Sequence, residues 1–267
     1  MTQQPIVLAV ETSSRIGSLA IAQGSELLDE ITFSGPLRHS TEILPAAGAL
    51  LERFGYIADN IAEIHISIGP GSFTGLRIAV AMAKTMHLAN GVRIVAVDSL
   101  DTIAANTVDV LHHQTIQGER CDPVPDRIAA VLDAKRGRFY AAIYDRSDPG
   151  QSWRPNPDRD SDQYRIPAGA GRLWRKVVSD RLMTAQELSA STSLEKPLGL
   201  LGDGLTYHRD KFDVEGVRIL ADKIWSPRAA NVYRLGCQKA RAGLFADPLT
   251  LTPFYLRGPQ VTLKKSP

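Results

Sequence analysis

The sequence IHISIGPGSFTGLR, residues 64–77, decides the fold of this 267-residue chain. Its first residues are mostly apolar and predict a buried strand that runs directly into Gly69, Pro70 and Gly71. Because proline fixes φ and glycine accepts backbone angles that side chains forbid, these three residues predict a sharp turn. Ser72 or Thr74 can then cap a helix, whose free N–H groups face whatever lies beyond the strand end. Taken alone, the motif is typical of a tight strand-to-helix connection.

The segments on either side show a change from strand to helix periodicity. The predicted elements are strands at 6–10, 18–22 and 26–33, a helix at 40–54, a strand at 63–68, a helix at 73–89 and a strand at 93–97. Three antiparallel strands followed by alternating helices and strands is the element order of the ribonuclease-H-like half of an actin/hexokinase/Hsp70-type domain. Strict alternation from the first strand would instead indicate a Rossmann sheet. We therefore expect an α/β fold of this type.

A second block begins near residue 127 with an apolar strand, a turn and a returning strand. This hairpin predicts the opening of a second, related lobe, again a mixed sheet flanked by helices. The predicted division is a first lobe at 1–106, a loop at 107–126, a second lobe at 127–257 with a polar insert at 145–172, and a basic tail at 258–267.

Composition excludes several classes of protein. Hydrophobic residues make up 43% of the chain, and the net charge of +2 does not demand a nucleic-acid partner. Cys121 and Cys237 are far apart and form neither a disulfide framework nor a zinc motif. The start of the chain lacks a signal-peptide pattern, and its apolar run is too short to cross a membrane. We expect a cytoplasmic protein with no membrane partner.

Four motifs, in order along the chain, resemble the TsaB (YeaZ) family. AVETSS at 9–14 is similar to the first phosphate loop of the actin/hexokinase/Hsp70 superfamily, and GPGSFTGLR at 69–77 looks like the family signature. DAKRGRFY at 133–140 resembles the hairpin of the family's second lobe, and PFYLR at 253–257 resembles its C-terminal motif. Each motif alone is weak, and together they are specific.

The resemblance implies a part in making N6-threonylcarbamoyladenosine (t6A) at tRNA position 37, beside the anticodon. It implies a non-catalytic subunit that forms a heterodimer with the catalytic paralogue TsaD and activates it. TsaE is expected to join the pair, and TsaC to supply the threonylcarbamoyl donor. The implied contact with tRNA is indirect, through the complex, and a homodimer is expected when TsaD is absent.

The same resemblance predicts that catalytic and metal-binding residues are missing. The TsaD paralogue carries two metal-binding histidines four residues apart, and the matching positions here hold Ser99 and Ile103. Serine is a poor ligand and isoleucine cannot bind a metal. The remaining histidines are scattered or adjacent, and no Gly-x-Ser-x-Gly elbow occurs. We expect neither a catalytic residue nor a metal.

The residues of the first loop do not decide whether the chain binds a nucleotide. Superfamily members that use ATP place an acid there to hold magnesium through water, so Glu11, Thr12 and Ser13 are the candidate residues for a weak or vestigial site. Asp133 and the turn at 202–204 are candidates from the second lobe. The first loop has no glycine that would give phosphates backbone room. Glu11 can equally serve as a structural acid of the turn. We expect no cofactor, with weak or interfacial nucleotide binding as the alternative.

The helix at 73–89 is apolar nearly all round, which indicates neighbours on every side. One side can lie on the sheet, and with the helix at 40–54 the other is expected to contact TsaD or a second copy of the chain. Packing of both helices inside this chain is the alternative. The predicted partner-interface residues are Ala46, Leu50, Arg53, Leu76, Ala79, Val80, Ala83 and His87.

Two enzymes are the competing hypotheses. A stand-alone ATP-dependent small-molecule kinase of the same fold would turn over ATP by itself and depend on Glu11. The threonylcarbamoyl transferase itself would require a bound metal. The expectation from the motifs is the non-catalytic subunit.

Overall fold

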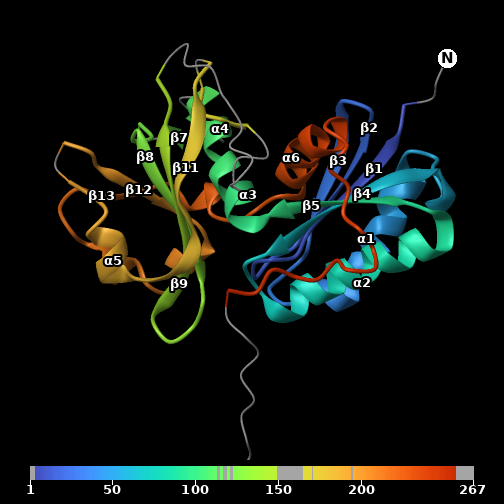
Figure 1. The fold of residues 1–267 in the computed structure, drawn as a ribbon, viewed down its shortest axis with the longest axis horizontal. Helices are drawn as coiled ribbons and strands as arrows, with labels where there is room; N and C mark the ends of the chain where they lie inside the picture. The colour runs from blue at the N-terminus through green and yellow to red at the C-terminus, as the bar shows by residue number, and fades with distance from the viewer. Residues whose placement is uncertain are drawn as a thin grey trace, which may run out of the picture.

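The computed structural model describes residues 4–112, 115–116, 119–120, 123–148, 165–169, 171–193 and 195–256. In these residues the chain forms two large mixed sheets, one in each half of the molecule (Figure 1). The first has the strand order β3-β2-β1-β4-β5 and the second β10-β11-β9-β8-β12-β13. The first has three antiparallel strands followed by two parallel ones, and the second repeats this pattern with β10 as an additional antiparallel edge strand. This repetition confirms the predicted actin/hexokinase/Hsp70-like α/β fold with two related sheets.

The first sheet follows the predicted elements closely. Its strands are β1 (Ile6–Glu11), β2 (Ser18–Gln23), β3 (Glu26–Thr32), β4 (Ile61–Gly69) and β5 (Arg93–Asp98). The central strand β1 is buried along its whole length, which explains its unbroken apolar run. Helices α1 (His39–Arg53) and α2 (Phe73–Asn90) cover one face of this sheet (Figure 1). A short 3-10 turn, η1 (Ala58–Asn60), precedes β4.

The ends of α2 show the predicted capping chemistry. Ser72 is the N-cap residue, and its hydroxyl accepts a hydrogen bond from the Gly75 N–H at 3.3 Å. Gly91 ends the helix at a φ of 70°, in the left-handed region that favours glycine. Between these ends, α2 packs on the sheet through small side chains, with Ala79 and Ala83 fully buried. Their size lets the helix approach the strands closely.

The second sheet comes from a chain segment with shorter elements. They are β8 (Arg127–Asp133), β9 (Arg138–Arg146), β10 (Ile166–Pro167), β11 (Leu173–Thr184), α5 (Ala185–Ser189), β12 (Leu198–Leu201) and β13 (Val217–Ile219). Three 3-10 turns accompany them, namely η3 (Asp203–Leu205), η4 (Arg209–Phe212) and η5 (Asp222–Ile224). The long strand β11 pairs with β9 and had no counterpart among the predicted elements.

The predicted division of the chain needs three corrections. The segment 107–126, expected as a loop, contains helix α4 (Thr107–His112) and the short strands β6 (Thr115–Ile116) and β7 (Glu119–Arg120). The predicted insert at 145–172 is shorter at both ends, because β9 runs to Arg146 and β10 pairs with β11. Residues 149–164 of this insert, and the predicted tail at 258–267, lie outside the described residues.

The third correction concerns helix α6 (Ala229–Arg241), which was expected in the second lobe. It packs on β1, β2, β4 and β5, on the face of the first sheet opposite to α1 and α2 (Figure 1). Gly236 lets this happen, because a Cβ at that position would lie 2.4 Å from Nδ1 of the buried His65 ring. The C-terminal part of the chain therefore returns to complete the first lobe.

Helix α3 (Ser99–Ala105) lies between the two sheets, and an ion cluster ties it to β11. The Lys176 ammonium is buried, 2.8 Å from carboxylate oxygens of both Asp101 and Asp180. The Tyr144 hydroxyl donates to Asp101 at 2.6 Å. A buried charge that loses its partner is costly, so these bonds hold the two lobes in one relative orientation.

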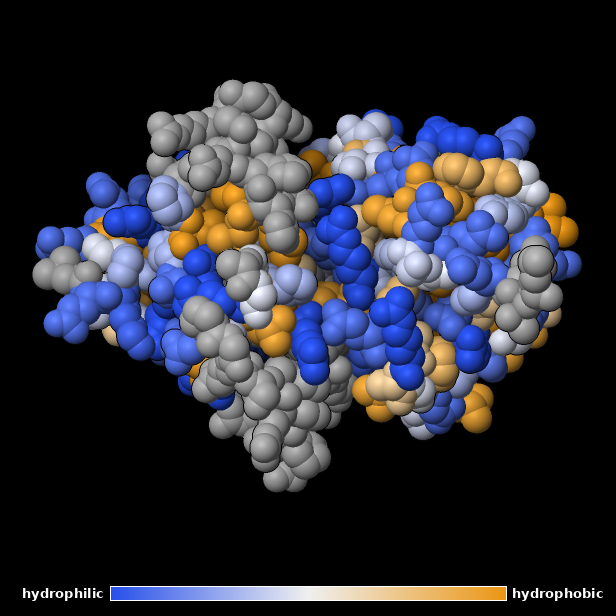
Figure 2. All heavy atoms as spheres, turned by 90° about the horizontal axis from the view of Figure 1, so that it is seen from above, coloured by the Kyte–Doolittle hydropathy of each residue, from blue (hydrophilic) through white to orange (hydrophobic). Residues whose placement is uncertain are grey.

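One side of the molecule has a largely hydrophilic surface. Figure 2 shows the side away from α1 and α2, where hydrophilic side chains cover both lobes and apolar ones form separate groups. No helix among the described residues is both long and apolar enough to cross a membrane.

Candidate functional site

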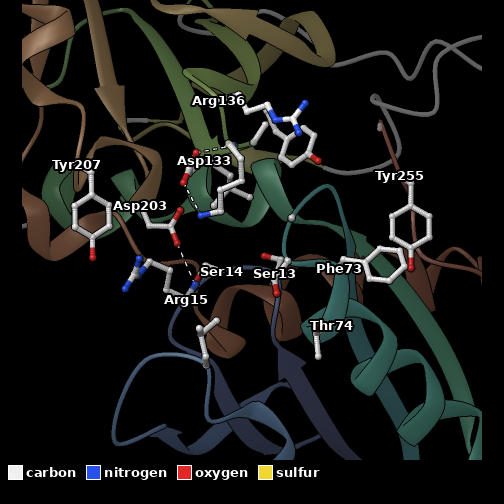
Figure 3. A pocket seen from close by; sticks show the side chains of 17 residues that line it. Ser13, Ser14, Arg15, Phe73, Thr74, Asp133, Arg136, Asp203, Tyr207 and Tyr255 are labelled. Carbon is white, nitrogen blue, oxygen red and sulfur yellow. Dashed lines mark hydrogen bonds and ion pairs between the residues drawn. The ribbon is translucent and has the colours of Figure 1, made fainter. Parts of the chain in front are cut away.

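A cleft of about 450 Å³ lies between the lobes. It is built by the loop after β1, the start of α2, the β8–β9 turn, and residues near η3 and the C-terminal segment (Figure 3). Its lining includes Ser13, Ser14, Arg15, Phe73, Asp133, Lys135, Arg136, Asp203, Tyr207 and Tyr255. A volume of this size accommodates a small ligand, typically in the range of about 300–1,000 Å³.

The loop after β1 is bonded directly to the glycine motif. The Ser72 N–H donates to the Ser13 carbonyl at 2.7 Å, and the Thr12 hydroxyl donates to the Gly75 carbonyl at 2.8 Å. A Cβ at Gly71 would lie 2.3 Å from the Ser13 carbonyl oxygen, and one at Gly75 would lie 2.0 Å from the Thr12 carbonyl oxygen. The glycines are therefore needed for close backbone contact between two segments as well as for the turn itself.

Glu11 is fully buried at the base of this loop. One of its oxygens accepts hydrogen bonds from the Ser13 N–H at 2.5 Å and the Ser13 hydroxyl at 2.6 Å. The other oxygen has no hydrogen-bond partner among the described residues. Burial raises the pKa of Glu11 to about 7, although the Ser13 bonds oppose the rise. These contacts make Glu11 a structural acid of the turn.

Asp203 reaches the same loop from the second lobe. Its carboxylate accepts a hydrogen bond from the Arg15 N–H at 3.1 Å (Figure 3), and burial raises its pKa to about 6. Glu11 and Asp203 thus occupy the N–H groups of Ser13 and Arg15, and Ser67 accepts the N–H of Thr12 at 3.4 Å. A nucleotide phosphate needs such N–H donors, and it is repelled by carboxylates. The loop as built fits a phosphate group poorly.

The chain is similar to several known proteins. A family model described as "TsaD: tRNA N6-adenosine threonylcarbamoyltransferase" matches residues 34–150. The chain is 28% identical over 254 residues to the tRNA threonylcarbamoyladenosine biosynthesis protein TsaB of Bacillus subtilis, covering 94% of this chain and 93% of that protein. It is 24% identical to the protein of the same name from Escherichia coli, covering 98% of each chain. The chain belongs to the TsaB (YeaZ) family.

The solved structures agree in fold. YeaZ from Pseudomonas aeruginosa superposes with a TM-score of 0.69 at 20% identity, over 94% of this chain and all of that chain. A second structure from the same organism, described as similar to peptidase YEAZ, has a TM-score of 0.68, also at 20% identity. Both span the two sheets, so the arrangement of the lobes is that of the family.

The positions predicted to match the TsaD metal ligands lie deep in the molecule. Ser99 and Ile103 are both fully buried on α3, between the sheets. The Ser99 hydroxyl has no hydrogen-bond partner among the described residues, and Ile103 belongs to the apolar core. Neither position faces the cleft lining. A group of three or more His, Cys, Asp or Glu side chains suited to a metal is not found in the part of the chain that the structure describes.

The predicted partner-interface residues are mostly wrong, because they form the inner side of the helices. Leu50, Leu76, Ala79 and Ala83 are 0% exposed, and Ala46 and Val80 are also buried. The last two predicted residues lie outside this core: Arg53 is exposed and ion-paired with Asp29, whereas His87 is half-buried with its Nδ1 3.0 Å from the Val92 carbonyl oxygen. The helical spacing identified apolar residues along each helix, but it did not show which of them pack on the sheet and which face away from it.

A different set of residues on α1 and α2 faces away from the sheet, and we call it the outer face. It consists of Leu44, Pro45, Gly48 and Ala49 on α1, and Arg77, Ala81, Thr85 and Leu88 on α2. Leu44 is 67% exposed and Leu88 80% exposed, so each helix presents an apolar side chain to solvent on this face. Their spacing of three or four residues puts each set on one side of its helix.

The raised pKa of Glu11 leads to a pH-dependent prediction. Glu11→Gln keeps an oxygen that accepts the Ser13 bonds but carries no charge. In the wild type the folded carboxyl holds its proton more tightly than the unfolded one, so stability falls as pH rises from about 4.5 to about 7. The variant loses this dependence. Its free energy of unfolding relative to the wild type should therefore increase by about 3 kcal/mol between about pH 4 and pH 8.

Denaturant unfolding of both proteins across this pH range measures the difference. The uncharged amide leaves a buried N–H₂ group where the unpartnered oxygen stood, which adds a constant offset without changing the slope. A difference that stays flat over the whole range would refute the raised pKa of Glu11.

Proposed function

We propose that this chain is a non-catalytic subunit in t6A biosynthesis, which forms a heterodimer with TsaD and activates it. The relatives that it matches over most of their length are named tRNA threonylcarbamoyladenosine biosynthesis protein TsaB. The observation that carries the proposal is the first loop, in which the N–H groups of Ser13 and Arg15 are bound by Glu11 and Asp203. A loop closed in this way supports a partner role and argues against turnover of a phosphate substrate.

The outer face of α1 and α2 is the proposed TsaD contact. It combines exposed leucines with small residues that allow a second pair of helices to approach closely. The segment that matches the TsaD family model, residues 34–150, includes both helices. Two similar helix pairs can therefore pack face to face around a pseudo-twofold axis, in a four-helix arrangement. A second copy of this chain would take the same place when TsaD is absent.

The proposed roles of TsaE and tRNA follow from the same heterodimer. TsaE joins the TsaD-bound chain, and tRNA is bound by the complex. We propose no resident cofactor for this chain. The kinase gains no support from the first loop, because the N–H groups of Ser13 and Arg15 are occupied. The metal-dependent transferase gains none from α3, because the two predicted ligand positions hold Ser99 and Ile103.

Reconstitution tests the proposed function. Purified TsaD, TsaE and TsaC are incubated with ATP, threonine, bicarbonate and tRNA, with and without this chain, and t6A is measured by mass spectrometry of digested tRNA. We expect t6A only when the chain is present. Equal t6A without the chain would contradict the proposal. ATP turnover by the isolated chain that Glu11→Ala abolishes would favour the kinase instead.

A further inference from the structure

Charged side chains from both lobes meet in one buried cluster beside α3. The ammonium of Lys176, on β11, is 2.8 Å from carboxylate oxygens of Asp101 and Asp180. It is also 3.9 Å from an oxygen of Asp98, the last residue of β5. Both Lys176 and Asp101 are buried. The ion pairs therefore join the second sheet to α3 and to the end of the first sheet, away from water.

Two more groups complete the cluster, one from each lobe. Lys239 of α6 is buried, donates to a backbone carbonyl of β5 at 2.7 Å and acts on Asp98 as a nearby positive charge. Tyr144 of β9 donates its hydroxyl to Asp101 at 2.6 Å, and the Lys176 ammonium lies 5.7 Å from the centre of the tyrosine ring. We call these six residues the lobe clamp: Asp98, Asp101, Tyr144, Lys176, Asp180 and Lys239.

The lobe clamp has more acidic groups than basic ones. If every group were ionised, three carboxylates would face two ammonium groups, and one negative charge would be left over. Oδ2 of Asp180 is buried and has no hydrogen-bond partner among the described residues, which makes a charge on it costly. Burial raises the pKa of Asp98 to about 7 and also raises that of Asp180, although Lys176 opposes both shifts. The geometry therefore fits a clamp that holds one proton.

We propose that the lobe clamp is a pH-dependent lock between the two lobes. One proton, shared among its carboxyl groups, leaves the buried cluster without net charge. When a carboxyl O–H gives this proton to water, the excess negative charge is left inside the cluster, and β11 separates more readily from α3. Asp98 offers the route to solvent, because its side chain is 24% exposed, whereas those of Asp101 and Asp180 are 0% and 8% exposed.

Opening of the lobe clamp also loosens the cleft, whose two sides belong to different lobes. Two contacts that cross the cleft are the hydrogen bond from the Arg15 N–H to Asp203 and the packing of the Arg15 guanidinium on the Tyr207 ring. Both require a fixed separation of the lobes, so both weaken when β11 leaves α3. The inference does not rest on the proposed function, because it concerns the two lobes of one chain.

The direction of the pH dependence follows from the raised pKa of Asp98. The closed clamp binds a proton more tightly than the open one, in which the pKa of Asp98 returns to its ordinary value of 3.8. The stabilisation from this proton is complete below about pH 4 and is lost as the pH rises through about 7. For these two pKa values, opening becomes about tenfold more frequent between about pH 6 and about pH 8.5.

Hydrogen–deuterium exchange of the purified full chain, followed by mass spectrometry, tests the inference on peptides from α3 and β11. Exchange times are scaled to the intrinsic rate at each pH, so that a change in protection reports local opening. Asp98→Asn and Asp180→Asn each replace a carboxyl by a neutral amide of the same shape, and two variants are used in case one fails to fold. Asp213→Asn is the matched control, since Asp213 is exposed on the second lobe. Circular dichroism checks that each variant is folded.

In the wild type and in Asp213→Asn, protection of α3 and β11 should fall about tenfold between about pH 6 and about pH 8.5. In Asp98→Asn and in Asp180→Asn the clamp has no excess charge, so protection should change by less than about threefold. Glu11 and Asp203 also have raised pKa values, but they titrate in all four proteins. Protection that is independent of pH in the wild type, or that falls equally in the folded amide variants, would overturn the inference. Neither result bears on whether t6A formation requires the chain.

Discussion

Gly75→Ala is expected to destabilise the protein by about 3 kcal/mol, and so to lower its melting temperature by roughly 10 °C. The added Cβ would lie 2.0 Å from the Thr12 carbonyl oxygen and 3.1 Å from its carbon, both backbone atoms. Thr12 cannot retreat freely, because its hydroxyl donates to the Gly75 carbonyl and its N–H bonds to Ser67. Either α2 or the loop after β1 must move, which would also distort the cleft. Denaturant and thermal unfolding measure the loss.

Gly48→Ala is the matched control. Gly48 lies in α1 on the outer face, and a Cβ there would meet nothing within 4 Å. Alanine is the better helix former, so this variant should gain about 0.5–1 kcal/mol. Gly75 also lies in a helix, and the same propensity gain applies there. If the two variants changed stability alike, the close approach of α2 to the first loop would not be a determinant of the fold.

A glutamate on the outer face should separate the chain from TsaD. Leu44→Glu and Ala81→Glu each place a charge on an exposed position of α1 or α2. At the centre of a desolvated interface such a charge costs at least about 2 kcal/mol, or about 30-fold in affinity. Each variant should remain folded, because the substituted side chain contacts water in the free chain. Calorimetric titration against TsaD, and t6A formation in the reconstituted reaction, measure the loss.

Two further substitutions define the specificity of this test. Val214→Glu changes an exposed apolar residue of the second lobe and should leave the affinity for TsaD unaltered. Ala79→Glu buries a charge between α2 and the sheet and should unfold the protein, so its loss of binding would carry no information about the interface. Undiminished binding of TsaD by both outer-face variants would exclude this face as the contact.

Local sequence patterns were sufficient to predict the strands and helices of the first sheet. The apolar run of β1 and the alternation of helices and strands up to β5 predicted each element to within a few residues. A strand that is buried on both faces has a continuous run of apolar residues, and a helix that packs on a sheet has apolar residues every three or four positions. Both patterns can be recognised in the sequence without knowing which segment each element packs against. The family motifs were likewise local, and the comparisons confirm the membership that they indicated.

Local sequence patterns could not predict which side of each helix packs on the sheet. Helix α2 is apolar on most of its circumference, so spacing alone could not distinguish Ala79 and Ala83, which pack on the sheet, from Ala81, which faces outward. Helix α6 follows the second lobe in sequence and yet packs on the first sheet. Its placement depends on Gly236 lying over the His65 ring, a contact between distant segments.

The amino-acid sequence by itself determined the elements of the first sheet, their order, the turn at the glycine motif and the family, because each of these depends on residues close together in the chain. The tertiary structure alone decided which atoms occupy the N–H groups of the first loop and which side chains face the cleft. Asp203 reaches the Arg15 N–H from 188 residues away, and Tyr207 meets Arg15 across the same gap between the lobes. Such contacts arise only when two lobes are fixed relative to one another, by α3 and the buried Lys176 cluster.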